Sequence, residues 1–437
     1  MSLRKETVRG YTNYVMSAKK VLMIGWEYPP HHSGGLGVAC QGMAHALIDN
    51  DVHVCFLLPR TLKLTDTKVT VLFADEPTKT TELKTKTEII PLHLETLARE
   101  LQNPYLTSIE YETRLTMFLK AGGKIVPRTL VEQVEHYGKL TKAMLRERYD
   151  DVDVIHAHDW LCFPAGIAAK EALGKPLVAH VHATEFDRGG GTGVNEIVYQ
   201  RERDGMMRAD HIIAVSELTK KIIVEKYGIH PDKVTVVHNG NSPTVSGTLS
   251  RFPHLEELKR QGKKIVLFAG RITIQKGVDY FVHAAKRVLE HNKDVYFVIA
   301  GSGDMERQII NLTADLHISS HFIFTGYYTL PELTGLFAIT DVFVMPSVSE
   351  PFGIVPLESI SNGVPVIMSK QSGVSEIVTH ALKTDFWDTE KMASQILAVI
   401  TYSPLKQTLR DEGYRQVEGI TWDKAAKKIS AVYQALT

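Results

Sequence analysis

The chain has 437 residues, 44% of them hydrophobic, which is enough for two or three domains that each bury a core. Its 50 Lys and Arg residues balance its 50 Asp and Glu residues, which argues against a general nucleic-acid-binding protein. Three cysteines without disulfide or zinc spacing, a polar start and no long apolar run predict a cytoplasmic protein without a membrane segment.

Short apolar runs alternate with helical stretches through the first half of the chain. Strands are expected at 21–24, 52–58, 154–156, 177–181 and 212–215. This alternation is typical of βαβ units and predicts a doubly wound parallel sheet. Residues 61–91, rich in Thr and Lys, break the pattern and are expected to form edge strands.

A glycine-rich turn follows the first strand and opens a helix expected over 38–47. Gly34, Gly35 and Gly37 would let the backbone approach a donor substrate closely, although a tight packing turn explains them equally well. The turn is not G-x-G-x-x-G, and the turn at Gly301 also lacks a third glycine, which disfavours a nicotinamide enzyme. These four glycines are candidate donor-binding residues.

Two H-x-H sequences end neighbouring strands, His156 with His158 and His180 with His182. Such histidines can bind zinc, hydrogen-bond sugar hydroxyls as neutral imidazoles, or lie satisfied in the core. We favour sugar binding for His182 and Asp159, and core positions for His156 and His180. Metal binding ranks last, because H-x-H metal hydrolases are built on an eightfold βα barrel.

A Ser-, Pro-, Thr- and Gly-rich stretch after Asn241 is expected to link two domains, 1–240 and 241–419. The pattern then restarts, since 263–270 resembles 19–25. Further strands are expected at 265–269, 296–300, 322–325, 342–345 and 364–368. Residues 422–436 carry an apolar stripe at helical spacing, which predicts packing.

Two cations, Arg271 and Lys276, follow the strand expected at 265–269. Ligands of open α/β sheets bind at the carboxyl ends of strands. A guanidinium fork and an ammonium group both suit phosphate oxygens, so this loop is predicted to hold a diphosphate.

Two carboxylates, Glu350 and Glu358, stand eight residues apart where the strand at 342–345 ends and a helix begins. Glu350 can accept hydrogen bonds from sugar hydroxyls, and Glu358, about two turns along the helix, can face a ribose diol. The helix N-terminus offers free donors to a diphosphate, namely the amides of Phe352, Gly353, Ile354 and Val355. Together with the two cations, this pattern favours a nucleotide-sugar site over unrelated surface charges.

The runs S-G-G-L-G, H-A-H-D-W, G-R-I-T-I-Q-K-G and E-P-F-G-I-V-P-L-E resemble those of the retaining GT-B glycosyltransferases, above all the glycogen and starch synthases. The resemblance implies two Rossmann-like domains facing across a cleft, with the final helix, 420–437, crossing back onto the first. It implies transfer of glucose from ADP-glucose or UDP-glucose to the non-reducing end of an α-1,4-glucan, with retention and without a metal cofactor.

The resemblance also implies roles for single residues. It assigns Arg271 and Lys276 to the donor diphosphate, His182 to the glucose 6-hydroxyl and the reaction centre, and Glu350 to the glucose hydroxyls. It puts Asp159 near the acceptor, Asn239 beside the donor and Tyr327 by the base.

Two positions depart from the synthase pattern. His32 stands where the synthases carry the lysine of K-x-G-G-L-G, and residues 371–376 replace their S-T-G-G-L run. Other acceptors therefore stay open: a small sugar, a sugar phosphate or a lipid. Two alternatives of other classes are a histidine-ligated metal hydrolase and a non-catalytic glucan-binding protein.

Overall fold

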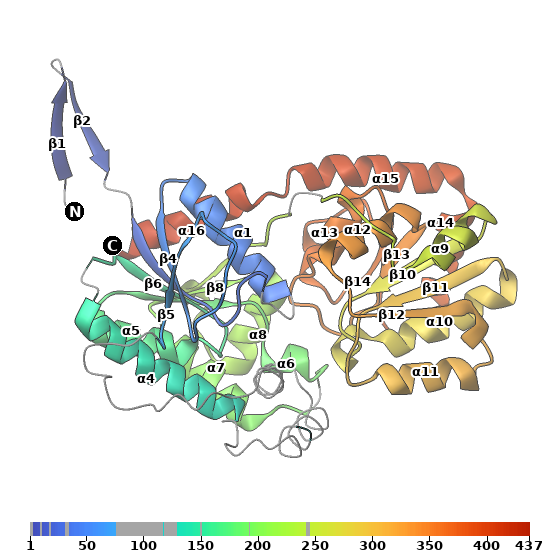
Figure 1. Cartoon of the computed structure of the whole chain (residues 1–437), viewed down its shortest axis with the longest axis horizontal. Helices are drawn as coiled ribbons and strands as arrows, with labels where there is room; N and C mark the ends of the chain where they lie inside the picture. The colour runs from blue at the N-terminus through green and yellow to red at the C-terminus, as the bar shows by residue number, and fades with distance from the viewer. Residues whose placement is uncertain are drawn as a thin grey trace.

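The computed structural model describes residues 3–8, 11–16, 19–30, 35–75, 117, 129–148, 151–191, 193–241 and 245–437. Within them the chain forms a seven-stranded sheet, a six-stranded sheet and a two-stranded antiparallel hairpin (Figure 1). The hairpin consists of β1 (Leu3–Val8) and β2 (Tyr11–Met16). Figure 1 shows it projecting from the N-terminal half, away from both large sheets.

The first large sheet is parallel throughout, in the order β5-β4-β3-β6-β7-β8-β9. Its strands are β3 (Lys20–Ile24), β4 (His53–Leu58), β5 (Thr70–Phe73), β6 (Val154–His158), β7 (Leu177–Val181), β8 (His211–Ala214) and β9 (Val234–Val236). All five predicted strands of this half are present. An edge strand expected within 61–91 is also present as β5, while 76–91 lie outside the described residues.

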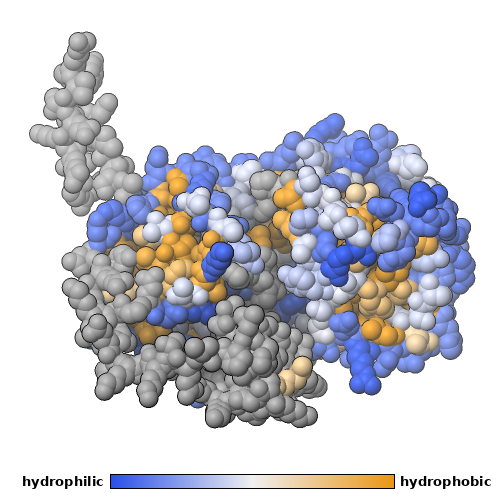
Figure 2. Space-filling view, in the orientation of Figure 1, coloured by the Kyte–Doolittle hydropathy of each residue, from blue (hydrophilic) through white to orange (hydrophobic). Residues whose placement is uncertain are grey.

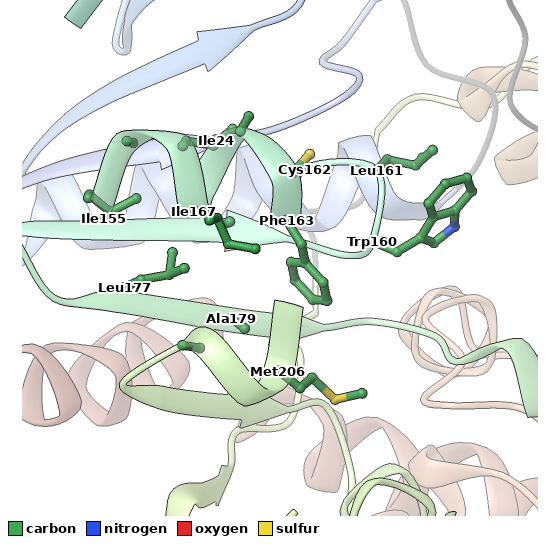
Figure 3. Packing of buried hydrophobic residues seen from close by; sticks show 14 of the residues in the cluster. Ile24, Ile155, Trp160, Leu161, Cys162, Phe163, Ile167, Leu177, Ala179 and Met206 are labelled. Atoms are coloured by element: carbon green, nitrogen blue, oxygen red, sulfur yellow. The ribbon is translucent and has the colours of Figure 1, made fainter. Parts of the chain in front are cut away.

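Helices cover both faces of this sheet. They are α1 (Gly35–Asp49), α4 (Leu130–Arg148), α5 (Phe163–Leu173), α6 (Glu185–Arg188), α7 (Glu196–Arg208), α8 (Glu217–Tyr227) and the short η1 (Pro231–Lys233). Because strand side chains alternate, Leu22 of β3 joins the core under α4 and α5, whereas Met23 joins the core under α1. Figure 3 shows Phe163 pointing from α5 toward Met206 of α7. A Cβ at Gly205 would lie 2.2 Å from the Phe163 ring, so only glycine allows this contact.

The second large sheet is also parallel, in the order β12-β11-β10-β13-β14-β15. Its strands are β10 (Lys264–Ala269), β11 (Val295–Ala300), β12 (Phe322–Gly326), β13 (Val342–Met345), β14 (Val366–Ser369) and β15 (Leu382–Thr384). Every strand predicted for this half is present. One face packs against α10 (Val278–His291), α11 (Glu306–Asp315) and α14 (Thr389–Thr401). The other packs against α9 (Pro253–Arg260), α12 (Leu330–Ile339), α13 (Val355–Ser361) and α15 (Ser403–Glu418). Three short turns, η2 (Ile274–Lys276), η3 (Ser319–His321) and η4 (Gly373–Glu376), complete this half.

The last helix, α16 (Trp422–Leu436), returns to the first half and packs beside α1 (Figure 1). Its apolar stripe lies in the core there, as predicted from its spacing. The two chain crossings run side by side, because the Asn241 amide donates to the carbonyl of Ile420 at 3.0 Å. By Gly247 the outgoing chain already packs on Gly335 of α12.

Two open, doubly wound parallel sheets joined by this double crossing confirm the predicted GT-B fold class. They are not the eightfold barrel that the metal hydrolase alternative requires. On the face shown in Figure 2, hydrophobic residues form patches interrupted by hydrophilic ones. Among the described residues, no helix combines the length and the apolar character needed to cross a bilayer.

Candidate active site

The carboxyl ends of the two sheets contact each other through their loops. The Ser349 hydroxyl, in the loop after β13, donates to Oδ1 of Asp187 on α6 at 2.6 Å. The Ser216 hydroxyl, after β8, donates to the carbonyl of Pro351 at 2.5 Å. The loops that were predicted to bind the donor, the glucose and the acceptor therefore lie at one boundary between the halves.

Lys276 and Glu350 form an ion pair at this boundary. Lys276 Nζ lies 2.5 Å from Glu350 Oε2, and the Ser347 hydroxyl donates to the same oxygen at 3.1 Å. The side chains are 20% and 9% exposed. Gly277, at φ 62°, lets the Lys276 loop pass the β13 loop, since a Cβ there would lie 2.2 Å from the Pro346 carbonyl oxygen. The structure thus brings together a predicted phosphate ligand and a predicted sugar ligand.

Arg271 is half-buried in the loop after β10, next to Gly270. This loop crosses the β11 loop closely, because a Cβ at Gly301 would lie 1.9 Å from the Gly270 carbonyl oxygen. Gly301 thus has a packing reason to be glycine. Its contact with a donor stays a prediction.

The second carboxylate, Glu358, lies on α13, which begins at Val355 after the N-cap Ile354. Gly353 has a left-handed φ of 96°, and a Cβ there would lie 3.1 Å from Glu350 Cγ, so the turn between the two acids is fitted closely. Burial raises the pKa of Glu358 to about 7. Whether Phe352 and the other amides of this turn hold a phosphate stays a prediction.

Four histidines stack at the ends of β6 and β7. His158 Nδ1 lies 2.9 Å from His182 Nε2, and His156 Nε2 lies 3.1 Å from His180 Nδ1. Burial lowers the pKa of His182 and of His156 to about 3, and lowers those of the other two as well, so all four are neutral at pH 7. His156, His158 and His180 are fully buried, whereas His182 is partly exposed. A neutral, partly exposed imidazole suits the sugar contact predicted for His182.

Asp159 adopts a left-handed backbone, φ 58°, directly after β6. Its Oδ1 accepts hydrogen bonds from the amides of His182 and Ala183 at 2.7 and 3.3 Å. Burial raises the pKa of this carboxyl to about 7, against the opposing effect of Arg188. Asp159 therefore fixes the loop that carries His182, a role that the sequence did not reveal.

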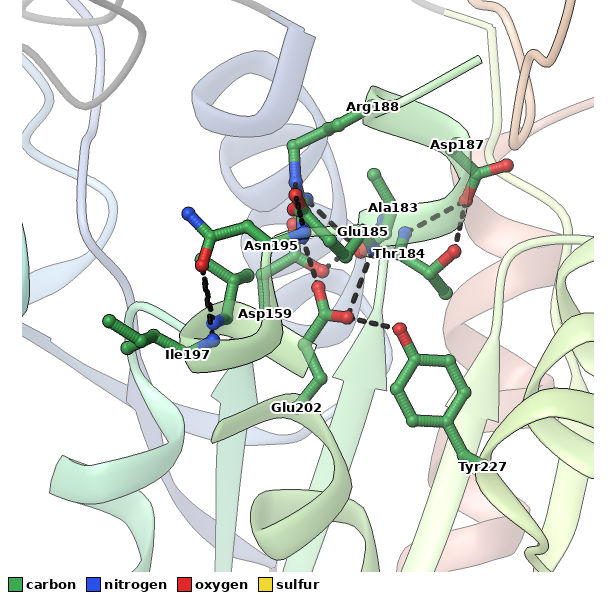
Figure 4. Close-up of polar contacts among 11 residues, drawn as sticks. Asp159, Ala183, Thr184, Glu185, Asp187, Arg188, Asn195, Ile197, Glu202 and Tyr227 are labelled. Atoms are coloured by element: carbon green, nitrogen blue, oxygen red, sulfur yellow. Dashed lines mark hydrogen bonds and ion pairs between the residues drawn. The ribbon is translucent and has the colours of Figure 1, made fainter. Parts of the chain in front are cut away.

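The same loop is supported by a network around Glu202 of α7, shown in Figure 4. Glu202 accepts hydrogen bonds from the Glu185 amide at 3.0 Å and from the Tyr227 hydroxyl, and it forms an ion pair with Arg188. Burial disfavours the charge on Arg188, but the carboxylates of Glu202, Asp159 and Glu185 outweigh it and raise its pKa. Sequence reasoning missed these residues, because nothing in their spacing distinguishes them from surface charges.

The glycine-rich turn is described only from Gly35, so Gly34 and His32 lie outside the described residues. Gly35 begins α1 and faces open space. The amide of Gly37 donates to Glu27 Oε1 at 3.1 Å. One N–H donor at the start of this helix is thus hydrogen-bonded to a buried carboxylate of the protein, a contact that the sequence does not reveal.

Two further residues, Asn239 and Tyr327, were predicted to lie near the donor. Asn239 is buried next to the chain crossing, and its Oδ1 has no hydrogen-bond partner among the described residues. Tyr327 follows β12, is 61% exposed, and stacks on Tyr328 with ring centroids 6.4 Å apart. Their contacts with a donor stay predictions.

The segment 371–376, which departs from the synthase pattern, joins the two halves. The carboxylate of Glu376 accepts hydrogen bonds from the amides of Glu217 and Leu218, at the start of α8, at 2.9 and 2.8 Å. The same carboxylate lies 2.9 Å from His238 Nε2. A Cβ at Gly373 would lie 2.2 Å from the Pro351 carbonyl oxygen, so the segment fits closely into this contact.

Two family models of glycosyltransferases match this chain. Residues 253–416 match the family model for glycosyl transferases group 1, and residues 123–244 match that for glycosyltransferase family 4. The chain is 26% identical to a glycogen synthase of Mycobacterium tuberculosis, over 95% of this chain and 94% of that protein. An uncharacterised glycosyltransferase of Methanocaldococcus jannaschii is 29% identical, over 95% and 98% of the two chains.

Two further proteins are matched over most of their own length. The structure of sucrose-phosphate synthase from Thermosynechococcus elongatus superposes with a TM-score of 0.71 at 16% identity, over 96% of this chain and 99% of that one. An alpha-maltose-1-phosphate synthase of Mycolicibacterium smegmatis is 30% identical, over 65% of this chain and 79% of that protein. These matches show that the chain belongs to the group 1 glycosyltransferases.

Proposed function

We propose that this glycosyltransferase moves glucose from ADP-glucose or UDP-glucose to the non-reducing end of an α-1,4-glucan, with retention of configuration. The observation that carries the proposal is the Lys276–Glu350 pair at the boundary where the two sheets meet. A cation for the diphosphate and a carboxylate for the sugar hydroxyls then lie side by side, the carboxylate in a loop whose Ser349 contacts Asp187 of α6.

The chemistry of these groups suits departure of a nucleoside diphosphate. Arg271 and Lys276 would stabilise the negative charge that develops on the leaving phosphate. Glu350 accepts hydrogen bonds from Lys276 and Ser347. A carboxylate held in this way suits the role of a hydrogen-bond acceptor better than that of a covalent nucleophile. The leaving phosphate itself would then take the proton of the acceptor hydroxyl on the same face.

Support for glucose and for a glucan comes from named relatives. Two of them are a glycogen synthase and an alpha-maltose-1-phosphate synthase, and a solved structure of similar fold, from Anabaena, is titled as a complex with UDP-glucose. A second candidate, transfer to a sugar phosphate or related small acceptor, is favoured by a D-inositol 3-phosphate glycosyltransferase of Catenulispora acidiphila, 27% identical over 68% of this chain.

A panel of donors and acceptors tests the proposal. ADP-glucose and UDP-glucose are each mixed with glycogen, with inositol phosphate, with glucose phosphate or with a lipid acceptor. Released nucleotide and the anomeric configuration of the product are then measured. Glycogen extended by α-1,4-linked glucose is the expected result. Product on a small phosphate alone would establish the second candidate, and glucan binding without nucleotide release would establish a binding protein.

The matched variants are Glu350→Gln and Glu412→Gln. Glu350→Gln removes the charge that meets Lys276 while keeping the size of the side chain. It should lower turnover by orders of magnitude and leave binding of the free nucleotide nearly intact, because sugar contacts that tighten in the transition state affect rate more than ground-state binding. Glu412, half exposed on α15, should tolerate the same change. Near-normal turnover of Glu350→Gln would remove Glu350 from the site.

A further inference from the structure

A cysteine and two histidines, one of them the candidate site residue His182, lie close together at the ends of β6 and β7. Cys40 of α1, His158 at the end of β6 and His182 after β7 each offer one donor atom, and these atoms lie within 4.8 Å of one another. Cys40 and His158 are buried, and His182 is partly exposed. The proposed transfer reaction uses only His182, so the other two side chains are unexplained by it.

The cluster contains an unsatisfied polar atom. His158 Nε2 is buried and has no hydrogen-bond partner among the described residues, while its Nδ1 lies 2.9 Å from His182 Nε2. A buried polar nitrogen without a partner costs free energy, which a cation bound to it would recover. A thiol, a weak hydrogen-bonding group, offers little compensation. Sulfur and imidazole nitrogen are together the donor set that zinc and similar cations prefer.

The charge around Cys40 also suits a cation. The buried carboxylates of Glu27 and Asp159 lie close enough to interact electrostatically with Cys40. A bound divalent cation would be attracted by these carboxylates and would favour the thiolate of Cys40. The thiol proton passes to solvent when the metal–sulfur bond forms, which leaves the cation with one thiolate and two neutral imidazoles.

A second cluster, His156, His158 and His180, competes for His158. All three of its members are fully buried, and His156 Nδ1 lies 2.5 Å from the Tyr433 hydroxyl. Three neutral ligands would leave a full double charge in the interior, which is costly. The cluster with Cys40 is therefore the better site.

We propose that Cys40, His158 and His182 form a binding site for a thiophilic divalent cation such as Zn²⁺, and that the bound cation inhibits glycosyl transfer by immobilising His182. The inhibition rests on the proposed role of His182, whereas the binding does not. The site is inhibitory and supplies no step of the reaction.

Binding is tested with Co²⁺ on chelator-treated full-length protein. One equivalent should give the intense visible bands of four-coordinate cobalt and a near-ultraviolet sulfur-to-cobalt charge-transfer band. In wild-type protein with one equivalent of Zn²⁺, X-ray absorption should show one sulfur at about 2.3 Å and nitrogens at about 2.0–2.1 Å. This measurement needs no substitution. A weak six-coordinate cobalt spectrum, or a zinc shell without sulfur, would overturn the proposal.

The three cysteines supply matched variants. Cys40→Ser should abolish the charge-transfer band, whereas the double variant Cys55→Ser/Cys162→Ser, with Cys40 as its one remaining thiol, should keep it. Circular dichroism checks that both are folded, and if Cys40→Ser is not, the zinc absorption spectrum of the wild type decides. A band that survives in folded Cys40→Ser would refute the assignment.

Inhibition is tested by nucleotide release from ADP-glucose or UDP-glucose with glycogen. Zn²⁺ should inhibit the wild type reversibly, and Cys40→Ser should need at least about tenfold more Zn²⁺, since even outer contacts of metal ligands change affinity by that factor. Equal sensitivity of the two proteins would refute inhibition through this site. If metal-free wild type transfers no glucose, the proposed function fails, while the cobalt and zinc spectra still decide whether the cation binds.

Discussion

Asp159 should act through the loop that it holds rather than through its charge. Its Oδ1 is bonded to the amides of His182 and Ala183, and its backbone has a left-handed φ of 58°. Asp159→Asn keeps a side-chain oxygen for both amides and a residue type that tolerates this backbone. Asp159→Ala loses both.

The structure sets the size of the difference. Asp159→Ala removes the acceptor of two hydrogen bonds, a well-made one from the His182 amide at 2.7 Å and a weaker one from the Ala183 amide at 3.3 Å. It also places an alanine in the left-handed region of the backbone, which is strained. These effects should lower the free energy of unfolding by about 2–4 kcal/mol. At about pH 4, where the folded protein holds this carboxyl protonated, Asp159→Asn should change it by less than about 1 kcal/mol. With a pKa of about 7, the wild-type carboxyl is already half protonated at neutral pH, and the amide resembles that form.

Urea unfolding and turnover of the two variants, measured with the best substrate pair of the panel, decide between position and charge. We expect Asp159→Asn to keep most of the activity, and Asp159→Ala to lose turnover as His182 is displaced. An Asn variant as inactive as the Ala variant would show that the negative charge itself is needed. An Ala variant as stable as the wild type would show that the carboxylate does not hold the loop.

Three further outcomes are expected. Arg271→Ala and Lys276→Ala should each weaken binding of the nucleoside diphosphate by about 1.5–3 kcal/mol in titration calorimetry. Arg287→Ala, at an exposed position, is the control that should not change the affinity. Unchanged affinity in both test variants would reject the diphosphate assignment. Folding raises the pKa of Asp159 from 3.8 to about 7, so wild-type stability should fall as pH rises from about 4 to 7. This fall should exceed that of Asp159→Asn by at most about 4 kcal/mol, and parallel stability curves of the two proteins would contradict the buried carboxyl. The two halves should close further on the donor, which small-angle scattering detects as a smaller radius of gyration, and an unchanged radius would defeat the idea of a hinge.

The sheets could be predicted because strands buried on both faces read as continuous apolar runs. β10 and β13 are examples, buried at nearly every position and ended by loops whose charges mark the site. The sequence predicts that helix α1 starts at Val38, three residues after its observed start at Gly35, because glycine at the first helical positions hides the helical pattern.

The pairings within the site could not be predicted. Lys276 and Glu350 lie 74 residues apart, and their contact depends on the order of β10 and β13 in the sheet. The left-handed backbone of Asp159 and the buried position of Glu27 leave no periodic signal. Sequence spacing therefore identified which loops carry chemistry, but not which side chains hold those loops in place.

The way in which the halves meet bears on how the enzyme would work. Among the described residues, each core cluster belongs to one half, apart from Val215, which packs with the second half, and Ile354, which also packs against the first. Polar contacts cross the boundary at Glu376, Ser216 and Asp187. Water can replace such contacts at small net cost, whereas exposing a shared apolar core would be expensive. We therefore expect the halves to separate and close again, with the paired crossing at Asn241 keeping them aligned.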